Sequence, residues 1–479
     1  MNAVPNLMPA LPEILMACGG MFLLMLGVFR RSEPTEMIGW LAIAVLATAI
    51  FIISAVPSNE KVTFNDLFLV NAFTNFVKII TLLGSSLTLI LTMSWAKHER
   101  VSRFELPVLI VFATLGMMLM VSANGFIAAY VGLEMQSLSL YVLAAFHRGN
   151  MRATEAGVKY FVLGALASGL LLYGASLVYG FSGTTTFDGL EIALRQGVIN
   201  VGVIVGMVFV VCGFAFKISA VPFHMWTPDV YEGVPTPVTA FFSVAPKIAA
   251  LALLSRVLAG PFEPMMAQWQ QVLLVISIAS MLWGAFAAIV QTNIKRLLAY
   301  SSIGHVGYAL VGLVVGTQEG ARGLLFYMLI YLLMNVGTFA CILSMRVKGR
   351  YVEDISNLSG IAKNNPAIAL ALAVLMFSMA GLPPLAGFFG KFYIFVAAVN
   401  ADMVPLAVIG VLSSVVAAYY YLRIVKLMYF DEPAQIFDRP DFSTGLIMAV
   451  CSLLMLIYFV VPAPLIGGAE TAAAALSLG

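Results

Sequence analysis

Long apolar segments separated by short polar breaks recur along the whole chain. About 20 helical residues cross the hydrocarbon core of a bilayer, so this pattern predicts an all-α polytopic membrane protein with fourteen transmembrane helices. The predicted spans cover residues 7–29, 36–56, 73–95, 105–122, 124–146, 156–180, 199–229, 235–259, 270–290, 296–316, 321–345, 366–399, 404–428 and 442–462.

The composition supports this interpretation. Hydrophobic residues make up 61% of the 479 residues and charged residues 10%, with a mean hydropathy of +0.99. These values lie far outside the range of soluble globular proteins. The formal net charge is +2, and the basic residues are scattered through short loops. A nucleic-acid partner is therefore not expected, because such partners require a basic patch.

The distribution of Lys and Arg predicts the orientation of the chain. If the N-terminus lies outside, the inward segments contain 16 Lys and Arg residues and the outward segments four. The positive-inside rule then places both termini on the outer, periplasm-like side of a bacterial inner membrane. No Lys or Arg precedes the first apolar span, so a cleavable signal peptide is not predicted.

Two of the predicted spans are interrupted by proline. The seventh contains Ser219 to Pro222 and the twelfth contains Gly381 to Pro384; the missing N–H of proline breaks the helical hydrogen bonds. Each is the fourth span in a block of five, and an odd number of spans inverts the second block. Paired broken helices in inverted repeats indicate a transport path at mid-membrane. The predicted units are residues 1–104 (helices 1 to 3), 105–259 (first repeat), 260–430 (second repeat) and 431–479 (C-terminal helix).

Charged residues inside the apolar spans are the strongest functional signal. They are Glu134, Lys159, Lys217, Lys247 and Lys391. A charge near the bilayer centre costs roughly 2.5 to 3.5 kcal/mol on insertion scales, so such residues usually have a function in transport. None of the basic residues is arginine. A buried lysine can lose its proton near neutral pH, whereas a guanidinium stays charged. The pattern therefore predicts proton transfer.

The remaining polar residues add fewer constraints. His224 and His305 lie at membrane depth, and Ser301, His305 and Tyr308 share one face of their predicted helix. Either histidine could relay protons, or could simply hydrogen-bond two helices together. The four cysteines are far apart and form no C-x-x-C pair, so no metal site is predicted. No dinucleotide-binding or phosphate-binding glycine motif is present.

Several motifs resemble one known family over essentially the whole chain. They include Gly132-Leu133-Glu134-Met135-Gln136-Ser137, the stretch that begins at Lys159, Pro222-Phe223-His224-Met225-Trp226-Thr227-Pro228 with the Tyr231-Glu232-Gly233 that follows, and Gly381-Leu382-Pro383-Pro384 through Lys391. The chain resembles the antiporter-like membrane subunits of proton-pumping NADH-quinone oxidoreductase, respiratory complex I, which are related to cation/proton antiporters. Three features favour the subunit N branch. They are the Tyr231-Glu232-Gly233 motif, Lys391 at a position where subunit M typically has glutamate, and the absence of the long C-terminal lateral helix of subunit L.

This resemblance implies a role for each candidate residue. Glu134 and Lys217 would form an ion pair that Lys159 modulates, Lys247 would be the central relay, and Lys391 would deliver protons to the outer side. From its position alone, His224 is a candidate for a water-linked relay near the inner mouth, and His305 is a candidate proton relay. The resemblance also implies that no cofactor binds this chain, that NADH, FMN, Fe–S clusters and quinone belong to partner subunits, and that antiporter-like subunits are its neighbours in the membrane.

Alternatives remain open at each position. Glu134 and Lys217 could form an inert salt bridge, and Lys247 could merely bond carbonyl groups. Lys391 could extend its side chain to the membrane interface. We expect such an interfacial position for Lys78, which is near the outer end of its span. Lys159 lies close to a span end, and Lys295 is expected to anchor the inner surface. For the whole chain, the alternatives are a stand-alone cation/proton antiporter subunit and a non-conducting membrane scaffold.

Overall fold

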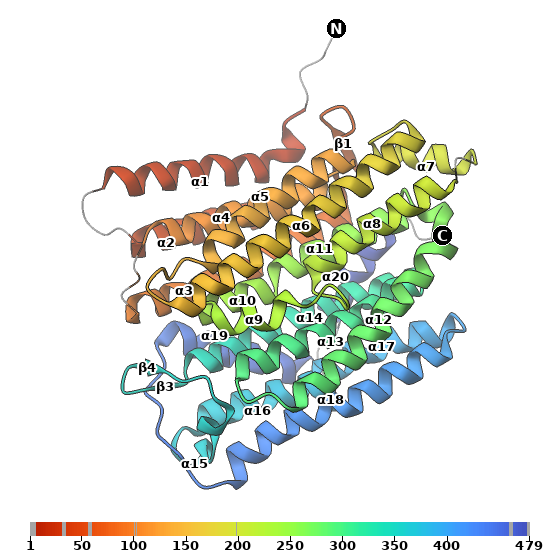
Figure 1. The fold of residues 1–479 in the computed structure, drawn as a ribbon. Coiled ribbons are helices and arrows are strands. Elements are labelled where there is room, and N and C mark those ends of the chain that lie inside the picture. The colour runs from red at the N-terminus through yellow and green to blue at the C-terminus, as the bar shows by residue number, and fades with distance from the viewer. Residues whose placement is uncertain are drawn as a thin grey trace.

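The chain forms a bundle of long helices that run side by side, from α1 at one edge to α18 at the other (Figure 1). The computed structural model describes residues 6–30, 35–55, 60–99, 101, 103–197, 199–458 and 463–476. Within these residues, 12 helices are long and apolar enough to cross a membrane. Predicted span 12 forms two shorter apolar helices, and predicted span 14 forms a third. The prediction of an all-helical polytopic protein is confirmed.

Three long helices precede the first predicted repeat. They are α1 (Leu11–Phe29), which follows a 3₁₀ turn (Met8–Ala10), α2 (Thr35–Ala55) and α3 (Ala72–His98). A small antiparallel hairpin, β1 (Lys61–Thr63) and β2 (Phe68–Val70), connects α2 to α3. The start of α3 is set by a capping box, in which Asn71 and Thr74 exchange side-chain and backbone hydrogen bonds.

The two predicted repeats contain the central helices. The first comprises α4 (Glu105–Ser122), α5 (Phe126–Ala144), α6 (Met151–Ser182), α7 (Phe187–Arg195), α8 (Val201–Ile218), α9 (Trp226–Gly233), α10 (Thr236–Ser243) and α11 (Ala245–Ala259). The second comprises a 3₁₀ turn (Glu263–Met265), α12 (Met266–Ile289), α13 (Ile294–Val314), α14 (Gln318–Leu343), β3 (Arg346–Val347), β4 (Arg350–Tyr351), a 3₁₀ turn (Ile355–Leu358), α15 (Ile361–Asn364), α16 (Pro366–Ala380), α17 (Ala386–Asn400) and α18 (Val404–Phe430). The chain ends with α19 (Phe442–Ile457) and α20 (Ala463–Ala474).

Helix pairing repeats in the same order in both blocks. In the first block α4 packs on α5 and α11, and in the second block α12 packs on α13 and α18. These pairings agree with two related blocks, although the exact domain boundaries remain a prediction. The short helices α7, α15 and α20 lie outside the predicted spans, and residues 459–462 of predicted span 14 lie outside the described residues.

Both predicted helix breaks are present. Helix α8 stops because Ser219 adopts the left-handed conformation (φ 65°), and α16 stops because Gly381 does (φ 85°). Each is followed three residues later by a proline with a cis peptide bond, Pro222 and Pro384. Because proline has no N–H, the helical hydrogen bonds cannot continue through it. The chain becomes helical again only at α9 and α17.

Span 8 is not the single helix that the sequence predicts. It consists of α10 and α11, which are separated at Val244 (φ −115°, ψ −83°). Pro246 occupies the first turn of α11, where its missing N–H costs no intrahelical bond. The predicted span 235–259 has Lys247 at its middle. In the structure, Lys247 lies instead in the first turn of α11.

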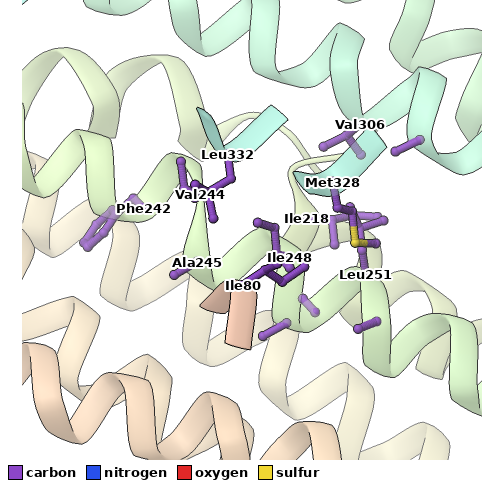
Figure 2. Packing of buried hydrophobic residues seen from close by; sticks show 14 of the residues in the cluster. Ile80, Ile218, Phe242, Val244, Ala245, Ile248, Leu251, Val306, Met328 and Leu332 are labelled. Atoms are coloured by element: carbon purple, nitrogen blue, oxygen red, sulfur yellow. The ribbon is translucent and has the colours of Figure 1, made fainter. Parts of the chain in front are cut away.

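The helix that carries Lys247 is at the centre of the bundle. All 15 residues of α11 are buried. Figure 2 shows Ile248 and Leu251 of α11 packed among side chains of α3, α8, α13 and α14, including Ile80, Ile218 and Met328. Polar residues on these helices are thus kept away from lipid, as a transport path at membrane depth requires. We call the face that carries Arg103, Arg148 and, in the first turn of α13, Arg296 the arginine-rich face, which the sequence predicts to be the inner one.

Close backbone contact between α4 and α5 positions Glu134. A Cβ atom at Gly116 would lie 2.5 Å from the backbone nitrogen of Gln136, so Gly116→Ala must push the helices apart. We expect this substitution to destabilise the protein by about 1 to 3 kcal/mol, measured as a lower thermal unfolding temperature of the purified chain in detergent. Gly169→Ala in α6 is the control, since nothing lies within 4 Å of its Cβ position. Equal unfolding temperatures for Gly116→Ala and the wild type would contradict the close contact.

Candidate functional site

Lys217 is buried at the end of α8, beside α5 and α6. Its Nζ donates hydrogen bonds to Ser137 Oγ (2.8 Å) and Ser168 Oγ (3.3 Å). Glu134 lies one helical turn from Ser137, but no ion pair to Lys217 forms within 4.0 Å. The expected Glu134–Lys217 ion pair is thus not formed, and two serine hydroxyls accept hydrogen bonds from the ammonium group. Glu134 Oε1 is buried and has no hydrogen-bond partner among the described residues.

Aromatic rings fill the space between Lys217 and Lys247. Lys217 Nζ lies 5.9 Å from the centre of the Tyr141 ring, and Lys247 Nζ lies 5.1 Å from that of Tyr231. Tyr160 connects the two sides, because its ring is 4.9 Å from Tyr141 and stacks on Trp226 at 4.6 Å. Within the described part of the chain, neither the Tyr141 hydroxyl nor the Tyr231 hydroxyl has a hydrogen-bond partner.

Lys247 is bound by hydroxyl groups. It is 1% exposed, and its Nζ donates a 2.5 Å hydrogen bond to Ser302 Oγ of α13. Ser302 in turn shares a 2.6 Å hydrogen bond with the Tyr331 hydroxyl of α14. Beside Lys247 is a small cavity of about 10 Å³ lined by His305, Tyr327 and Tyr331 among others. A cavity of this size holds about one water molecule.

His305 continues the polar series toward α18. Its Nδ1 lies 2.6 Å from the Tyr327 hydroxyl and its Nε2 3.1 Å from the Tyr421 hydroxyl. The Tyr421 hydroxyl also bonds Ser301 at 2.5 Å. Tyr308, seven residues after Ser301, accepts a hydrogen bond from Ser413 of α18 at 3.3 Å. Ser301, His305 and Tyr308 are thus all buried and hydrogen-bonded, and the role of His305 as a proton relay remains a prediction.

Lys391 is held by the broken end of α16. Its Nζ donates to the carbonyl oxygens of Met379 (2.9 Å) and Ala380 (3.2 Å) and to Ser414 Oγ (2.8 Å). Carbonyl groups in the last turn of a helix have no intrahelical donor and attract a cation. Lys391 Nζ also lies 4.8 Å from the centre of the Tyr308 ring. At 5% exposure it does not extend to the membrane interface, so that alternative is wrong.

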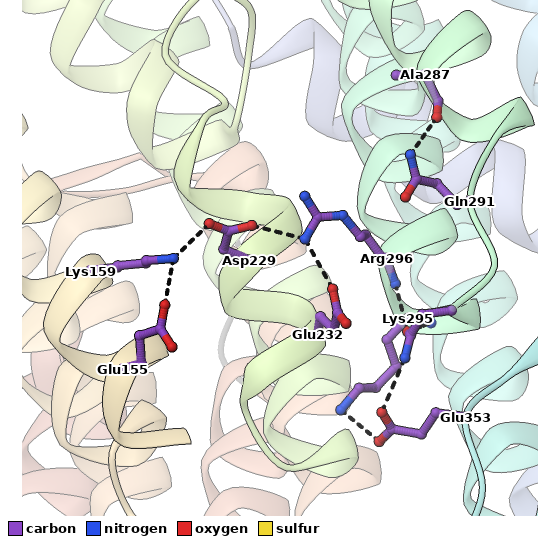
Figure 3. A network of polar contacts seen from close by, with 10 residues as sticks. Glu155, Lys159, Asp229, Glu232, Ala287, Gln291, Lys295, Arg296 and Glu353 are labelled. Atoms are coloured by element: carbon purple, nitrogen blue, oxygen red, sulfur yellow. Dashed lines mark hydrogen bonds and ion pairs between the residues drawn. The ribbon is translucent and has the colours of Figure 1, made fainter. Parts of the chain in front are cut away.

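Lys159 does not lie within this buried series. Its side chain is 43% exposed and forms ion pairs with Glu155 (2.8 Å) and Asp229 (2.9 Å). Asp229 also pairs with Arg296 of α13 at 2.9 Å, and Arg296 reaches Glu232 at the same distance (Figure 3). Lys159 is thus connected to α9, the helix after the first break. Its predicted modulation of Lys217 remains a prediction.

Two other residues differ from their expected places. His224 is half-buried between the first break and α9, with its ring 5.8 Å from that of Trp283. Its Nδ1 has no hydrogen-bond partner among the described residues, and its role as a water-linked relay remains a prediction. Lys295 is 3% exposed and pairs with Glu353 at 2.7 Å (Figure 3). It is therefore a buried ion-pair partner and not the predicted surface anchor.

Sequence reasoning missed the partners of the lysines. Ser137, Ser168, Ser302 and Ser414 are hydroxyl groups of a kind found in many transmembrane helices, so nothing in the sequence distinguished them. Tyr327 and Tyr331 are four residues apart on α14 and could have been recognised as one face. Arg256, counted among the four outward Lys and Arg residues, is instead buried near the end of α11, where its guanidinium donates to the carbonyls of Val121 (2.6 Å) and Ala123 (2.8 Å).

Lys78 forms a buried ion pair in place of the predicted interfacial position. Its Nζ lies 2.6 Å from Glu13 Oε1, and the two side chains are 1% and 3% exposed. Removing one partner leaves the other charge buried, so we expect Lys78→Met to cost about 3 to 5 kcal/mol of stability. Lys78→Met combined with Glu13→Gln should recover most of that loss, as measured by thermal unfolding in detergent. If the double variant is no more stable than Lys78→Met, the pair does not explain the burial of these groups.

The described residues contain no group of three His, Cys, Asp or Glu side chains placed to hold a metal ion. The site instead consists of amines, hydroxyls, an imidazole and a carboxyl group, all of which exchange protons through hydrogen bonds.

Comparison with known proteins identifies the family. The model of the family described as NADH:quinone oxidoreductase/Mrp antiporter, TM matches residues 123–417. NADH-quinone oxidoreductase subunit N of Rhodospirillum rubrum is 59% identical over 98% of this chain and 97% of its own length. The chain belongs to the NADH-quinone oxidoreductase subunit N family. The subunit N of Paramagnetospirillum magneticum is 57% identical, over 98% of both chains. This confirms the resemblance recognised in the motifs.

Solved structures share the fold of this chain. A chain of respiratory complex I from Thermus thermophilus with bound aureothin has a TM-score of 0.81 and 32% identity, over 95% of this chain and 98% of that one. A chain of the Mrp complex from Dietzia sp. DQ12-45-1b has a TM-score of 0.86 at 22% identity, over 98% of both chains, and shows the shared fold.

Proposed function

We propose that this chain translocates protons across the membrane as a membrane-arm subunit of an NADH-quinone oxidoreductase. The observation that supports this most directly is how Lys217, Lys247 and Lys391 are held. Each is at most 7% exposed, and each donates to hydroxyl or carbonyl oxygens. Among the ion pairs of the described residues, none includes these three lysines. Burial without a counter-ion disfavours the charged form of an amine, which allows it to release and rebind a proton.

The three lysines divide the proposed path into two parts. Between Lys247 and Lys391 the path is nearly continuous, through Ser302 and Tyr331, the one-water cavity, and His305 with its tyrosine partners. Between Lys217 and Lys247 the described residues form ring contacts, and the Tyr141 and Tyr231 hydroxyls have no hydrogen-bond partner among them. We infer that proton passage between Lys217 and Lys247 requires water to enter, and that this step is where flow is controlled.

Glu134 and Lys159 would act on the first lysine. Glu134 is the carboxyl group nearest along α5 to the serine that binds Lys217, so a small movement toward Lys217 would form the ion pair that the family resemblance implies. Lys159 would act through Asp229 and α9, because that helix directly follows the break after Lys217. His224, in the broken segment itself, would connect Lys217 to water at the arginine-rich face.

The energy for translocation would come from redox chemistry in partner subunits. NADH, FMN, Fe–S clusters and quinone are assigned to those subunits, and the neighbours in the membrane would be other antiporter-like subunits. The proposed location is the bacterial inner membrane, with both termini on the periplasmic side. The proposed functional units are residues 1–104, 105–259, 260–430 and 431–479, as the sequence predicts.

Proton pumping by the assembled complex in liposomes tests this function. NADH oxidation should acidify one compartment, and Lys391→Met should lower the number of protons moved per NADH without changing assembly. Lys426→Met is the matched control, because Lys426 is an exposed lysine at the end of α18. Sodium-dependent proton exchange in liposomes that contain this chain without redox partners would instead favour the cation/proton antiporter. Normal pumping by Lys391→Met would contradict the proposed path.

A further inference from the structure

A groove lies beside α4, α5 and α6, and one of its lining residues, Tyr141, separates it from Lys217. The three helices lie next to one another (Figure 1), and the groove between them has a volume of about 970 Å³. This is at the upper end of the range for ligand pockets in proteins, about 300 to 1,000 Å³. We call it the α4–α6 groove; its apolar walls include Phe112 of α4, Val142 of α5 and Phe161 of α6.

The mouth of the α4–α6 groove is basic. Arg103 precedes α4 and Arg148 follows α5, and because these helices are antiparallel both residues line the groove at the arginine-rich face. Both side chains are exposed, and neither forms a hydrogen bond or ion pair with another described residue. The lining contains one acidic residue, Glu105, and one histidine, His147, whose ring lies 6.0 Å from that of Trp95. The two unpaired guanidinium groups and the single carboxylate give the lining of the groove a net positive charge.

The groove extends from this charged mouth into the apolar part of the bundle. Phe112 and Phe161 are each seven residues further along their helices than the lining residues Glu105 and Thr154 at the mouth. Seven helical residues correspond to about 10 Å. The deepest lining residue on α5, Tyr141, also lies against Lys217. The groove thus has a polar end at the membrane surface and an apolar end at membrane depth, which is the distribution found in a phospholipid.

We propose that the α4–α6 groove binds an anionic phospholipid from the leaflet at the arginine-rich face. The phosphate groups would lie between Arg103 and Arg148, because guanidinium groups bind phosphate oxygens through paired hydrogen bonds. Basic pockets between transmembrane helices are known to hold such headgroups. One acyl chain would lie along Val142 and Phe161 and end near Tyr141. The bound lipid would then form one wall of the site around Lys217.

Photolabelling of the assembled complex tests this site. The probe is phosphatidylglycerol with a photoreactive group on one acyl chain, and phosphatidylcholine with the same chain is its zwitterionic counterpart. We expect phosphatidylglycerol to label peptides of α5 and α6 that contain Val142 and Phe161. Phosphatidylcholine should label them far less, and unlabelled cardiolipin should compete. Equal labelling by both probes would overturn the proposal, as would no labelling because a neighbouring subunit covers the groove.

Variants of the two arginines give an independent measure. Labelling by phosphatidylglycerol should fall about fivefold for Arg103→Gln or Arg148→Gln, and about 25-fold for the double variant, given the contribution of one basic residue near an anionic membrane surface. Arg350→Gln is the control, because Arg350 is exposed on the same predicted side but lies outside the groove. Unchanged labelling in the double variant would overturn the assignment of the headgroup. If the double variant does not assemble, the comparison of the two lipid probes on the wild-type complex still decides the matter.

Discussion

Replacing Lys247 with arginine is expected to stop proton flow through this chain even though the positive charge is retained. A guanidinium can still donate to Ser302 but stays protonated at any accessible pH. Because positioned proton-transfer groups contribute typically 10²- to 10⁴-fold, we expect the rate to fall by at least about 100-fold. The measurement is the number of protons moved per NADH by the assembled complex in liposomes, together with NADH:quinone electron transfer.

Two further variants make the Lys247 result interpretable. Lys247→Met has a similar length without a titratable group, and we expect the same loss of proton flow. Lys363→Arg is the control, since Lys363 is 60% exposed in the short helix α15. The amount of assembled complex on native gels separates a loss of transport from a loss of folding. If Lys247→Arg pumps normally, Lys247 has a structural role as a hydrogen-bond donor to Ser302.

Glu134→Gln is expected to have the second largest effect. Glutamine preserves the shape of the side chain but cannot carry the negative charge that would draw the ammonium of Lys217 away from Ser137 and Ser168. We expect proton pumping to fall by about 10- to 100-fold, because the charge proposed to move Lys217 between two sets of partners is lost. The rate of proton pumping and the rate of NADH oxidation should fall together if the movement of protons is tightly coupled to electron transfer.

A conservative variant and a matched control accompany this prediction. Glu134→Asp retains the carboxylate, so it should keep a substantial part of the pumping activity. Glu155→Gln removes an exposed carboxylate, 61% accessible, that pairs with Lys159 on the arginine-rich face. Because exposed ion pairs contribute little, typically 0.2 to 1 kcal/mol, we expect a small effect there. Normal pumping by Glu134→Gln would show that Glu134 is not needed as a charge.

Most of the helical framework could be predicted from the sequence because the bilayer imposes a simple rule. A span needs about 20 apolar residues, and Pro222 and Pro384 mark breaks through a local backbone property. The break at Val244 was missed because Pro246 is compatible with the first turn of a helix, so its position gave no clear signal. The charged residues at Lys217, Lys247 and Lys391 were found from the cost of placing them among apolar neighbours.

The sequence by itself determined the helix pattern, the two broken spans and the presence of lysines at membrane depth, since each depends on neighbouring residues along the chain. Only the tertiary structure decided what those lysines contact. Ser302 and Tyr331 come from α13 and α14, far from Lys247 in sequence. Helix packing also decides that Lys159 belongs to an exposed ion-pair network and that Lys78 forms a buried ion pair. Hydrogen-bond partners depend on which helix faces meet, and that is set by the packing of the whole bundle.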